Sequence, residues 1–340
     1  MHLEFDDVDP DEYSGLPKIK HVSHPHATLN RKPVSPKSKK GKSVQVIEPV
    51  QAQVDEMRMS YHASRHEHEW LLGSLEIFYE QQWFDDVLRL IKGGKEASVY
   101  LCAANASVGM EYLAAKVYRP RRFRSLKNDH FYQEGRSRLD QSGNLILDDG
   151  MNHAMDKRTQ YGLELLHGSW IEHEFQTMRI LHEAGADTPI PLERGNNVIL
   201  MSYVGEAESP APTLNTIDLS RQEAQVLFER VLHNIEVMLD HNRVHADLSA
   251  YNILYWDGDI TLIDFPQAIN PDENNNAYMI FQRDITRVCE YFARQGVSSK
   301  PVQIARSLWQ ARNRRITPQL DPRFLDDQSE ADRMIWNNRD

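Results

Sequence analysis

A short stretch in the second half of the chain carries residue types suited to proton transfer and cation binding. His245, Asp247 and Asn252 follow the spacing H-x-D-x-x-x-x-N, and a further aspartate, Asp264, comes soon after them. A carboxylate can orient a hydroxyl group and accept its proton, and amide and carboxylate oxygens are ligands that hard divalent cations prefer. The spacing therefore indicates one proton acceptor and two candidate cation ligands in one segment.

Two strand-like segments, residues 252–256 and 260–264, flank Asp257-Gly258, a dipeptide typical of a tight turn. Pairing the segments across this turn predicts that Asn252 lies opposite Asp264 at the open end of a hairpin. Their oxygens would then converge on one point, as a bound cation requires. A surface hairpin with ordinary polar ends is the alternative interpretation, and the two residues upstream at matching offsets favour the catalytic one.

The order of these residues is that of the protein-kinase catalytic loop and its metal-binding aspartate. In that arrangement Asp247 orients the acceptor hydroxyl and takes its proton, while Asn252 and Asp264 hold Mg²⁺. We therefore predict ATP-dependent phosphoryl transfer, with ATP and Mg²⁺ as cofactors.

A lysine that could contact the ATP phosphates lies in the strand-like segment 112–118. Lys116 stands in the string Ala-Ala-Lys-Val, close to the V-A-I-K pattern of kinases. A lysine in a strand is more often a solvated surface residue, so this interpretation requires a partner for its charge.

The predicted helix 170–184 supplies that partner. A capping box at residues 169–172 predicts its start, and Gly185 predicts its end. Glu174 falls within the apolar stripe of this helix, which comprises Ile171, Phe175, Met178 and Leu181. A carboxylate on a core-facing stripe is costly unless it is paired. We therefore predict an ion pair between Lys116 and Glu174, which kinases require.

Two further segments are candidates for nucleotide binding. Strand-like residues 87–91 and 97–101 flank a Lys-Gly-Gly-Lys-Glu turn whose backbone amides could cover phosphates, although a plain hairpin would look similar. The apolar strand that begins at Val198 leads into a segment suited to be the hinge that holds adenine. Met201 and Tyr203 are the candidate nucleotide contacts in this hinge.

The composition is that of an ordinary globular protein, with 340 residues, 40% hydrophobic and 26% charged. The net charge of -11 argues against general affinity for nucleic acids. Two distant cysteines favour a reducing compartment over a disulfide scaffold. The first residues lack the apolar core of a signal peptide, and no apolar run reaches membrane-spanning length. We therefore expect a cytoplasmic protein with no membrane contact.

The order of motifs predicts an α+β, bilobal protein-kinase-like fold with a reduced C-terminal lobe. Residues 1–65 have the composition of a disordered tail, and the eight Lys and Arg residues of stretch 18–42, without Asp or Glu, could contact RNA or simply be solvated. Residues 66–204 would form the N-terminal lobe, with a long polar insert at 119–168. Residues 205–340 would form a short C-terminal lobe, which lacks an A-P-E motif.

Together these segments resemble the RIO family of atypical serine/threonine kinases over residues 74–296, nearer the branch typified by the first RIO kinase. The string H-A-D-L-S-x-Y-N at residues 245–252 is the specific match. The other matching segments are G-K-E-A-S-V-Y at 94–100, A-K-V-Y at 115–118, the flexible-loop segment 131–136, the helix segment 170–175, and Ile263-Asp264 with Gln267.

The resemblance implies nucleotide-binding roles for Lys95 and Ser98 of the glycine loop. It also implies autophosphorylation on serine, often an ATPase-like cycle in maturation of the small ribosomal subunit, and a transient phosphate on Asp264. Two departures stand out. Lys92-Gly93 replaces the family's usual Ser-Thr, so a hydroxyl contact to phosphate is replaced by a lysine or lost, and residues 264–267 are closer to the second RIO branch.

Three functions remain open at this level. The leading hypothesis is a kinase that phosphorylates Ser or Thr in proteins, itself included. A small-molecule phosphotransferase of the aminoglycoside or choline kinase type shares the motifs but usually adds helices that this chain lacks. The third is an ATP-gated ribonucleoprotein-binding module with slow hydrolysis, little transfer to peptides and salt-sensitive RNA association.

Overall fold

The computed structural model describes residues 57–119, 137–140 and 142–316. The basic stretch 18–42 and the loop segment 131–136 lie outside the described residues, as do most of the predicted N-terminal tail and the C-terminal end.

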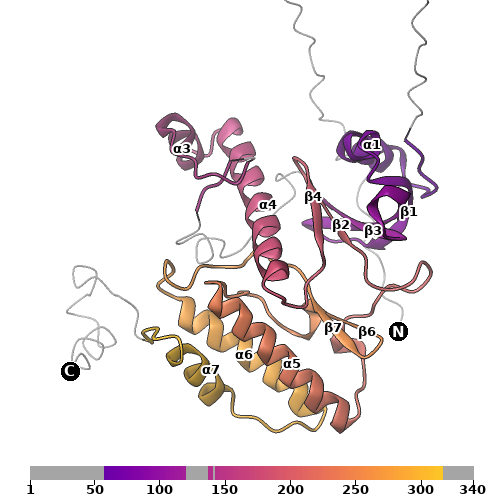
Figure 1. Cartoon of the computed structure of the whole chain (residues 1–340). Coiled ribbons are helices and arrows are strands. Elements are labelled where there is room, and N and C mark those ends of the chain that lie inside the picture. Colours follow the sequence, from indigo (N-terminus) through magenta and orange to yellow (C-terminus); the bar gives the residue numbers. More distant parts are fainter. Residues whose placement is uncertain (1–56, 120–136, 141, 317–340) are drawn as a thin grey trace, which may run out of the picture. The chain divides into compact units, whose positions relative to one another are not determined.

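An antiparallel five-stranded sheet forms the first lobe (Figure 1). In the order β1-β2-β3-β5-β4, its strands are β1 (Phe84–Lys92), β2 (Ala97–Ala104), β3 (Tyr112–Tyr118), β5 (Val198–Ser202) and β4 (Pro191–Arg194). The short turn η2 (Ala106–Val108) connects β2 to β3. Apolar side chains of α1 (Arg65–Glu80) pack on one face of this sheet.

Alternation along β3 divides its side chains between two cores. Ala115 and Val117 belong to the core under α1, whereas Tyr118 belongs to the core shared with the second lobe. Because successive side chains of a strand point to opposite faces, Lys116 points away from α1 and toward the second lobe.

The helix α4 (Gln160–Glu183) carries Glu174 and is longer than the predicted helix 170–184. The prediction of its start was wrong: the N-cap is Thr159, whose hydroxyl accepts a hydrogen bond from the Gly162 amide at 3.0 Å. The hydroxyl of Ser169 instead accepts a hydrogen bond from the Leu139 amide at 2.9 Å, within the helix body. The predicted end is confirmed, since Gly185 adopts φ 83° just after the C-cap.

Part of the predicted insert 119–168 is therefore helical. Its last residues form the first turns of α4, and α3 (Asp149–Asp156) packs against them. Gly162 is needed at this contact because a Cβ atom there would lie 1.9 Å from the carbonyl oxygen of Ala154.

The second lobe is mainly helical. It contains α5 (Arg221–Asp240), α6 (Ala277–Arg294), α7 (Pro301–Gln310), the hairpin β6 (Ile253–Trp256) and β7 (Asp259–Leu262), and the turns η4 (Leu214–Thr216) and η5 (Ala250–Asn252). Ser220 caps α5, and the apolar side chains of α5 are buried in the same core as those of α6. The two helices lie side by side (Figure 1). Within the described ranges, no helix has the length and apolar character needed to cross a membrane.

The hairpin forms around Asp257-Gly258 as predicted, but its register is shifted from our expectation. Trp256 pairs with Asp259 and Ile253 with Leu262, so Asn252 faces Ile263 rather than Asp264. A two-residue turn requires this pairing of its flanking residues. Asp264 therefore lies two residues beyond Leu262, the last residue of β7.

Candidate functional site

Asn252 links the catalytic loop to the end of the hairpin. Its side-chain amide donates hydrogen bonds to the carbonyl oxygen of Asp247 at 2.9 Å and to Oδ2 of Asp247 at 3.2 Å. Its backbone oxygen accepts a hydrogen bond from the Ile263 amide at 3.0 Å. Because these hydrogen bonds use the nitrogen of the amide group, the amide oxygen of Asn252 is not engaged by Asp247.

Two residues at the site have a left-handed backbone conformation, which is uncommon outside glycine, asparagine and aspartate. Ala246, next to Asp247, has φ 65°, and Asp264 has φ 73°. Such conformations cost on the order of 1–3 kcal/mol and persist where surrounding contacts enforce them. At Ala246 the carbonyl oxygen accepts a hydrogen bond from the Arg283 guanidinium. At Asp264 the carboxylate is held by Lys116.

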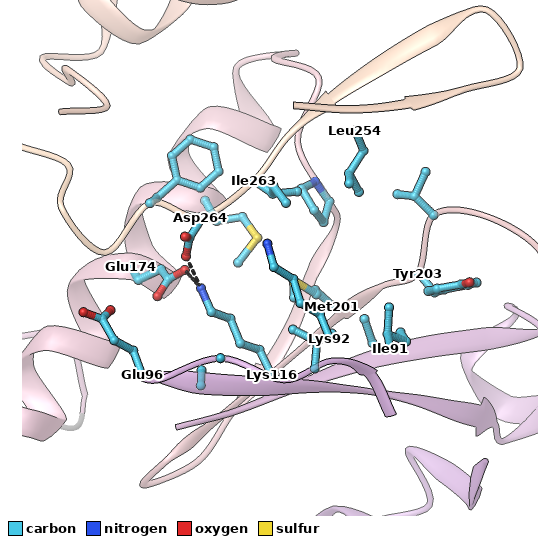
Figure 2. A pocket seen from close by; sticks show the side chains of 18 of the residues that line it. Ile91, Lys92, Glu96, Lys116, Glu174, Met201, Tyr203, Leu254, Ile263 and Asp264 are labelled. Carbon is cyan, nitrogen blue, oxygen red and sulfur yellow. Dashed lines mark hydrogen bonds and ion pairs between the residues drawn. The ribbon is translucent and has the colours of Figure 1, made fainter. Parts of the chain in front are cut away.

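Lys116 lies between two carboxylates. Its Nζ atom is 2.6 Å from Oε1 of Glu174 and 2.6 Å from Oδ1 of Asp264 (Figure 2). The pair with Glu174, predicted from the apolar stripe, is confirmed. The Glu174 side chain is 2% exposed and also accepts a hydrogen bond from the Tyr118 hydroxyl. Asp264 is 45% exposed, so one face of its carboxylate is open to a ligand.

The charges at this triad stabilise one another. Burial by itself would lower the pKa of Lys116, but the carboxylates of Asp264 and Glu174 hold that pKa well above its ordinary value. Partial desolvation at the cavity wall by itself would raise the pKa of Asp264, but Lys116 holds that pKa below its ordinary value. Lys116 and Asp264 are therefore both charged at neutral pH, as binding of an anion and a cation requires.

The triad lies at a cavity of about 730 Å³ between the two lobes, within the usual size range of ligand pockets. Five of the predicted nucleotide-site residues line it: Lys95, Lys116, Met201, Tyr203 and Asp264. Figure 2 shows the last four of these around the cavity. Ser98 does not: its side chain is buried on the opposite side of β2, where its hydroxyl accepts a hydrogen bond from Arg119 at 3.4 Å. Asp247 and Asn252 lie beyond this lining, joined to it through the hairpin end.

Helix α6 holds the catalytic loop through three charged residues that sequence reasoning did not assign. Arg283 contacts the carbonyl of Ala246, Asp284 accepts a hydrogen bond from the Leu248 amide, and Nη1 of Arg287 lies 2.9 Å from Oδ1 of Asp247. Side chains at i, i+1 and i+4 of a helix can lie along one side of it. This spacing was visible in the sequence, but nothing local indicated its target.

His245 has a structural role, connecting the catalytic loop to the segment around Asp264. Its ring is buried, and its Nε2 atom lies 3.1 Å from the carbonyl oxygen of Ile263. The ring packs against that of Phe265, with 4.9 Å between the ring centroids. Burial lowers its pKa, so the imidazole is neutral near pH 7. His173 of α4 likewise contacts the carbonyl of Ala268 at 2.7 Å. These contacts fix the segment around Asp264 against both the catalytic loop and α4.

Asp284 makes a testable contribution to pH-dependent stability. Burial raises its pKa to about 7, against the opposing charge of Arg283. The folded state therefore holds this proton more tightly than the unfolded chain, and the stabilisation is full below about pH 4 and lost as pH rises toward 7. Asp284→Asn cannot titrate and should not lose this stabilisation. Its free energy of unfolding, compared with that of the wild type, should therefore rise by about 2 kcal/mol as the pH is raised from 5 to 8.

Denaturant unfolding at several pH values measures this difference. Asp257→Asn, at the exposed tip of the hairpin, is the matched control and should show no such trend. A constant difference between wild type and Asp284→Asn across this range would contradict an elevated pKa.

The donor groups at the hairpin end fit Mg²⁺. One carboxylate and one amide oxygen come from residues on either side of the hairpin. Asp264 has a second oxygen besides the one that contacts Lys116, and its side chain is 45% exposed. Magnesium is commonly bound by one or two protein oxygens, with the other positions taken by substrate phosphates and water. Asn252 and Asp264 are therefore suitable as its protein ligands.

Comparison with known proteins places these motifs in a family. Residues 98–305 match the family model described as the RIO domain. The chain is 32% identical over 129 residues to serine/threonine-protein kinase RIO3 of Bos taurus, covering 38% of this chain and 25% of that protein. It is 32% identical over 136 residues to serine/threonine-protein kinase RIO1 of Homo sapiens, covering 40% and 24%.

The similarity extends to a relative in Thermoplasma acidophilum. Its RIO-type serine/threonine-protein kinase Rio1 is 30% identical over 135 residues, covering 40% of this chain and 69% of that protein. A solved kinase structure, PK-1 of the Cydia pomonella granulovirus, matches 57% of this chain at 13% identity with a TM-score of 0.34.

The chain spans about a quarter of the length of the two mammalian relatives. The matched region nonetheless contains Lys116, Glu174, the catalytic loop and Asp264, and it covers more than half of the chain. By this match and by the geometry of its site, the chain belongs to the RIO family.

Proposed function

We propose that this protein transfers the γ-phosphate of ATP to Ser or Thr hydroxyls of proteins, itself included. The observation that carries the proposal is the position of Lys116, paired with both Glu174 and Asp264 at a cavity that adjoins the catalytic loop. The relatives' names as serine/threonine-protein kinases support the same reaction.

In the proposed reaction, Asp247 orients the acceptor hydroxyl and accepts its proton as the oxygen attacks the γ-phosphorus. Asn252 keeps the carboxylate of Asp247 in place through its amide. Lys116, fixed by Glu174, neutralises charge on the phosphates, which is the main means by which such enzymes stabilise the transition state. Mg²⁺, held by Asn252 and Asp264, would supply further neutralisation of the phosphate oxygens. The bond to the β-phosphate oxygen breaks, and ADP leaves.

The cavity wall indicates where the nucleotide lies. Met201 and Tyr203 line the cavity near the end of β5, which suits the base, while Lys116 and Asp264 mark the position of the phosphates (Figure 2). Lys95 lies on the turn between β1 and β2 and would approach the phosphates from the side of the sheet. Ser98 was predicted to join them, but its buried side chain makes it the weakest of the proposed contacts.

Incubation of the purified full chain with radiolabelled ATP and Mg²⁺ tests the proposal. Protein-bound label and released phosphate are measured separately, for the wild type, Asp247→Ala and Asp264→Ala. Acid-stable label on serine or threonine that is lost in both variants is the expected result. Free phosphate with only acid-labile label would instead favour the ATP-gated ribonucleoprotein switch.

A third outcome concerns small molecules. Bound ATP without either label or phosphate would contradict both proposals and favour a small-molecule phosphotransferase. Aminoglycosides and choline are the first acceptors to test in that case, because those enzymes share the H-x-D-x-x-x-x-N loop.

We also propose a cytoplasmic location and contact with RNA or a pre-ribosome through stretch 18–42. The charge of this stretch supports the contact, because each lysine or arginine bound to a phosphate releases counterions. Deleting residues 1–56 should weaken RNA binding and reduce its dependence on salt. Unchanged binding would assign any RNA affinity to another part of the chain.

A further inference from the structure

A second lysine, Lys92, enters the cavity from the sheet. It is the last residue of β1, where the strand meets the Gly-Gly turn, and it lines the same cavity as Lys116. Both side chains extend from the sheet toward the loop that carries Asp264 (Figure 2). The strand β1 is irregular just before this residue, with a register shift between Leu90 and Lys92.

The register of the sheet explains why the two lysines share one face. Lys92 pairs with Val99 on β2, and Val99 pairs with Lys116 on β3. Directly opposed residues in an antiparallel sheet project to the same side. Lys92 and Lys116 are therefore two strands apart in one row, separated by about 10 Å at the backbone.

The two lysines differ in how their charges are satisfied. Lys116 is paired with two carboxylates, Glu174 and Asp264, so this triad as a whole carries a net negative charge. Among residues 57–316 as far as the structure describes them, no carboxylate forms an ion pair with Lys92.

A polyanion entering this cavity would meet an ammonium group that is not yet neutralised. We propose that Lys92 binds the phosphate chain of the nucleotide, as a contact additional to Lys116. This inference rests on the proposed nucleotide-dependent function. Lys116 is shared with two carboxylates, whereas Lys92 supplies a positive charge on the same face of the sheet that no carboxylate of the described residues neutralises.

Nucleotide affinity of the full chain, measured by calorimetry in the presence of Mg²⁺, tests this role. Lys92→Met keeps the aliphatic length of the side chain and removes its charge. We expect Lys92→Met to lower the affinity for ATP and for ADP by about tenfold, since a charged hydrogen bond is worth roughly that factor. The affinity for adenosine should change by less than about twofold. Lys92→Arg should retain ATP affinity within about threefold, and the ATP affinity of Lys92→Met should depend less on salt.

Lys300→Met, an exposed lysine at the start of α7, is the matched control and should bind every ligand like the wild type. Unchanged ATP affinity in Lys92→Met would overturn the inference. An equal loss for ATP and adenosine would also overturn it, because Lys92 would then only pack against the base. Failure of the wild type to bind ATP would overturn the proposed function itself, a result separate from either of these.

Discussion

Asp247→Asn is expected to reduce phosphoryl transfer by about 10²–10⁴-fold, the contribution typical of a positioned general base. Asparagine has the shape of aspartate but cannot accept the hydroxyl proton. ATP affinity should stay within about threefold, because Asp247 lies outside the cavity lining. The measurement is the rate of acid-stable labelling, together with ATP affinity of the same preparation.

The contacts of Asp247 indicate a small cost in stability. Its Oδ1 faces Arg287 and its Oδ2 faces Asn252, and both of these groups are donors. An asparagine can offer one oxygen, so one donor loses its acceptor. Asp247 and Arg287 are each 41% exposed, and water can replace the lost contact, so the free energy of unfolding should fall by no more than about 1 kcal/mol.

Asp257→Asn, at the tip of the adjoining hairpin, controls for removal of a carboxylate from this part of the chain. It should label like the wild type, since Asp257 is exposed and asparagine tolerates its φ of 50°. Wild-type labelling by Asp247→Asn would show that another group takes the proton and would contradict the assignment of the base.

Asp264→Asn is expected to abolish the advantage that Mg²⁺ gives to ATP binding and to bring transfer close to background. The substitution removes the one carboxylate among the two proposed metal ligands, and asparagine is among the residues that tolerate φ 73°. ATP affinity should be weakened by about tenfold at saturating Mg²⁺, and the residual activity should need higher Mg²⁺ concentrations. Titration of Mg²⁺ at fixed ATP measures both effects.

The effect on stability separates the roles of the two carboxylates around Lys116. After Asp264→Asn, Lys116 keeps its buried partner Glu174, so we expect little change in the unfolding midpoint. Asp259→Asn, at an exposed position of β7 in the same hairpin, is the matched control. If Asp264→Asn bound ATP with wild-type dependence on Mg²⁺, Asp264 would not be a metal ligand.

The sequence was sufficient to predict interactions that follow from local periodicity. Glu174 was predicted to be paired because it interrupts an apolar helical stripe, and its 2% exposure confirms the burial that made pairing necessary. The Asp257-Gly258 turn was also predicted, since it depends on the residues next to it. Each of these signals reflects a free-energy cost of folding that the chain offsets with neighbouring residues or with one partner that the sequence makes evident.

Local signals failed where a tertiary contact competed for the same groups. The apparent capping box at residues 169–172 does not begin a helix, because Ser169 bonds to Leu139 and Glu172 pairs with Arg194 across the lobe. The true start, Thr159, carries a weaker sequence signal. A side chain that can cap a helix can equally serve another donor, and only the fold decides which donor is near.

The sequence alone thus determined the motif order, the H-x-D-x-x-x-x-N loop, the Lys116–Glu174 pair and the resemblance to a family. Tertiary structure decided that Asp264 also reaches Lys116, that Arg287 holds Asp247, and that Lys92 shares a face with Lys116. The physical reason is that residue types and periodicity indicate which buried polar and charged groups need partners. The choice among distant partners depends on strand register, on the left-handed turn at Asp264 and on the placement of α6, which result from packing of the whole chain.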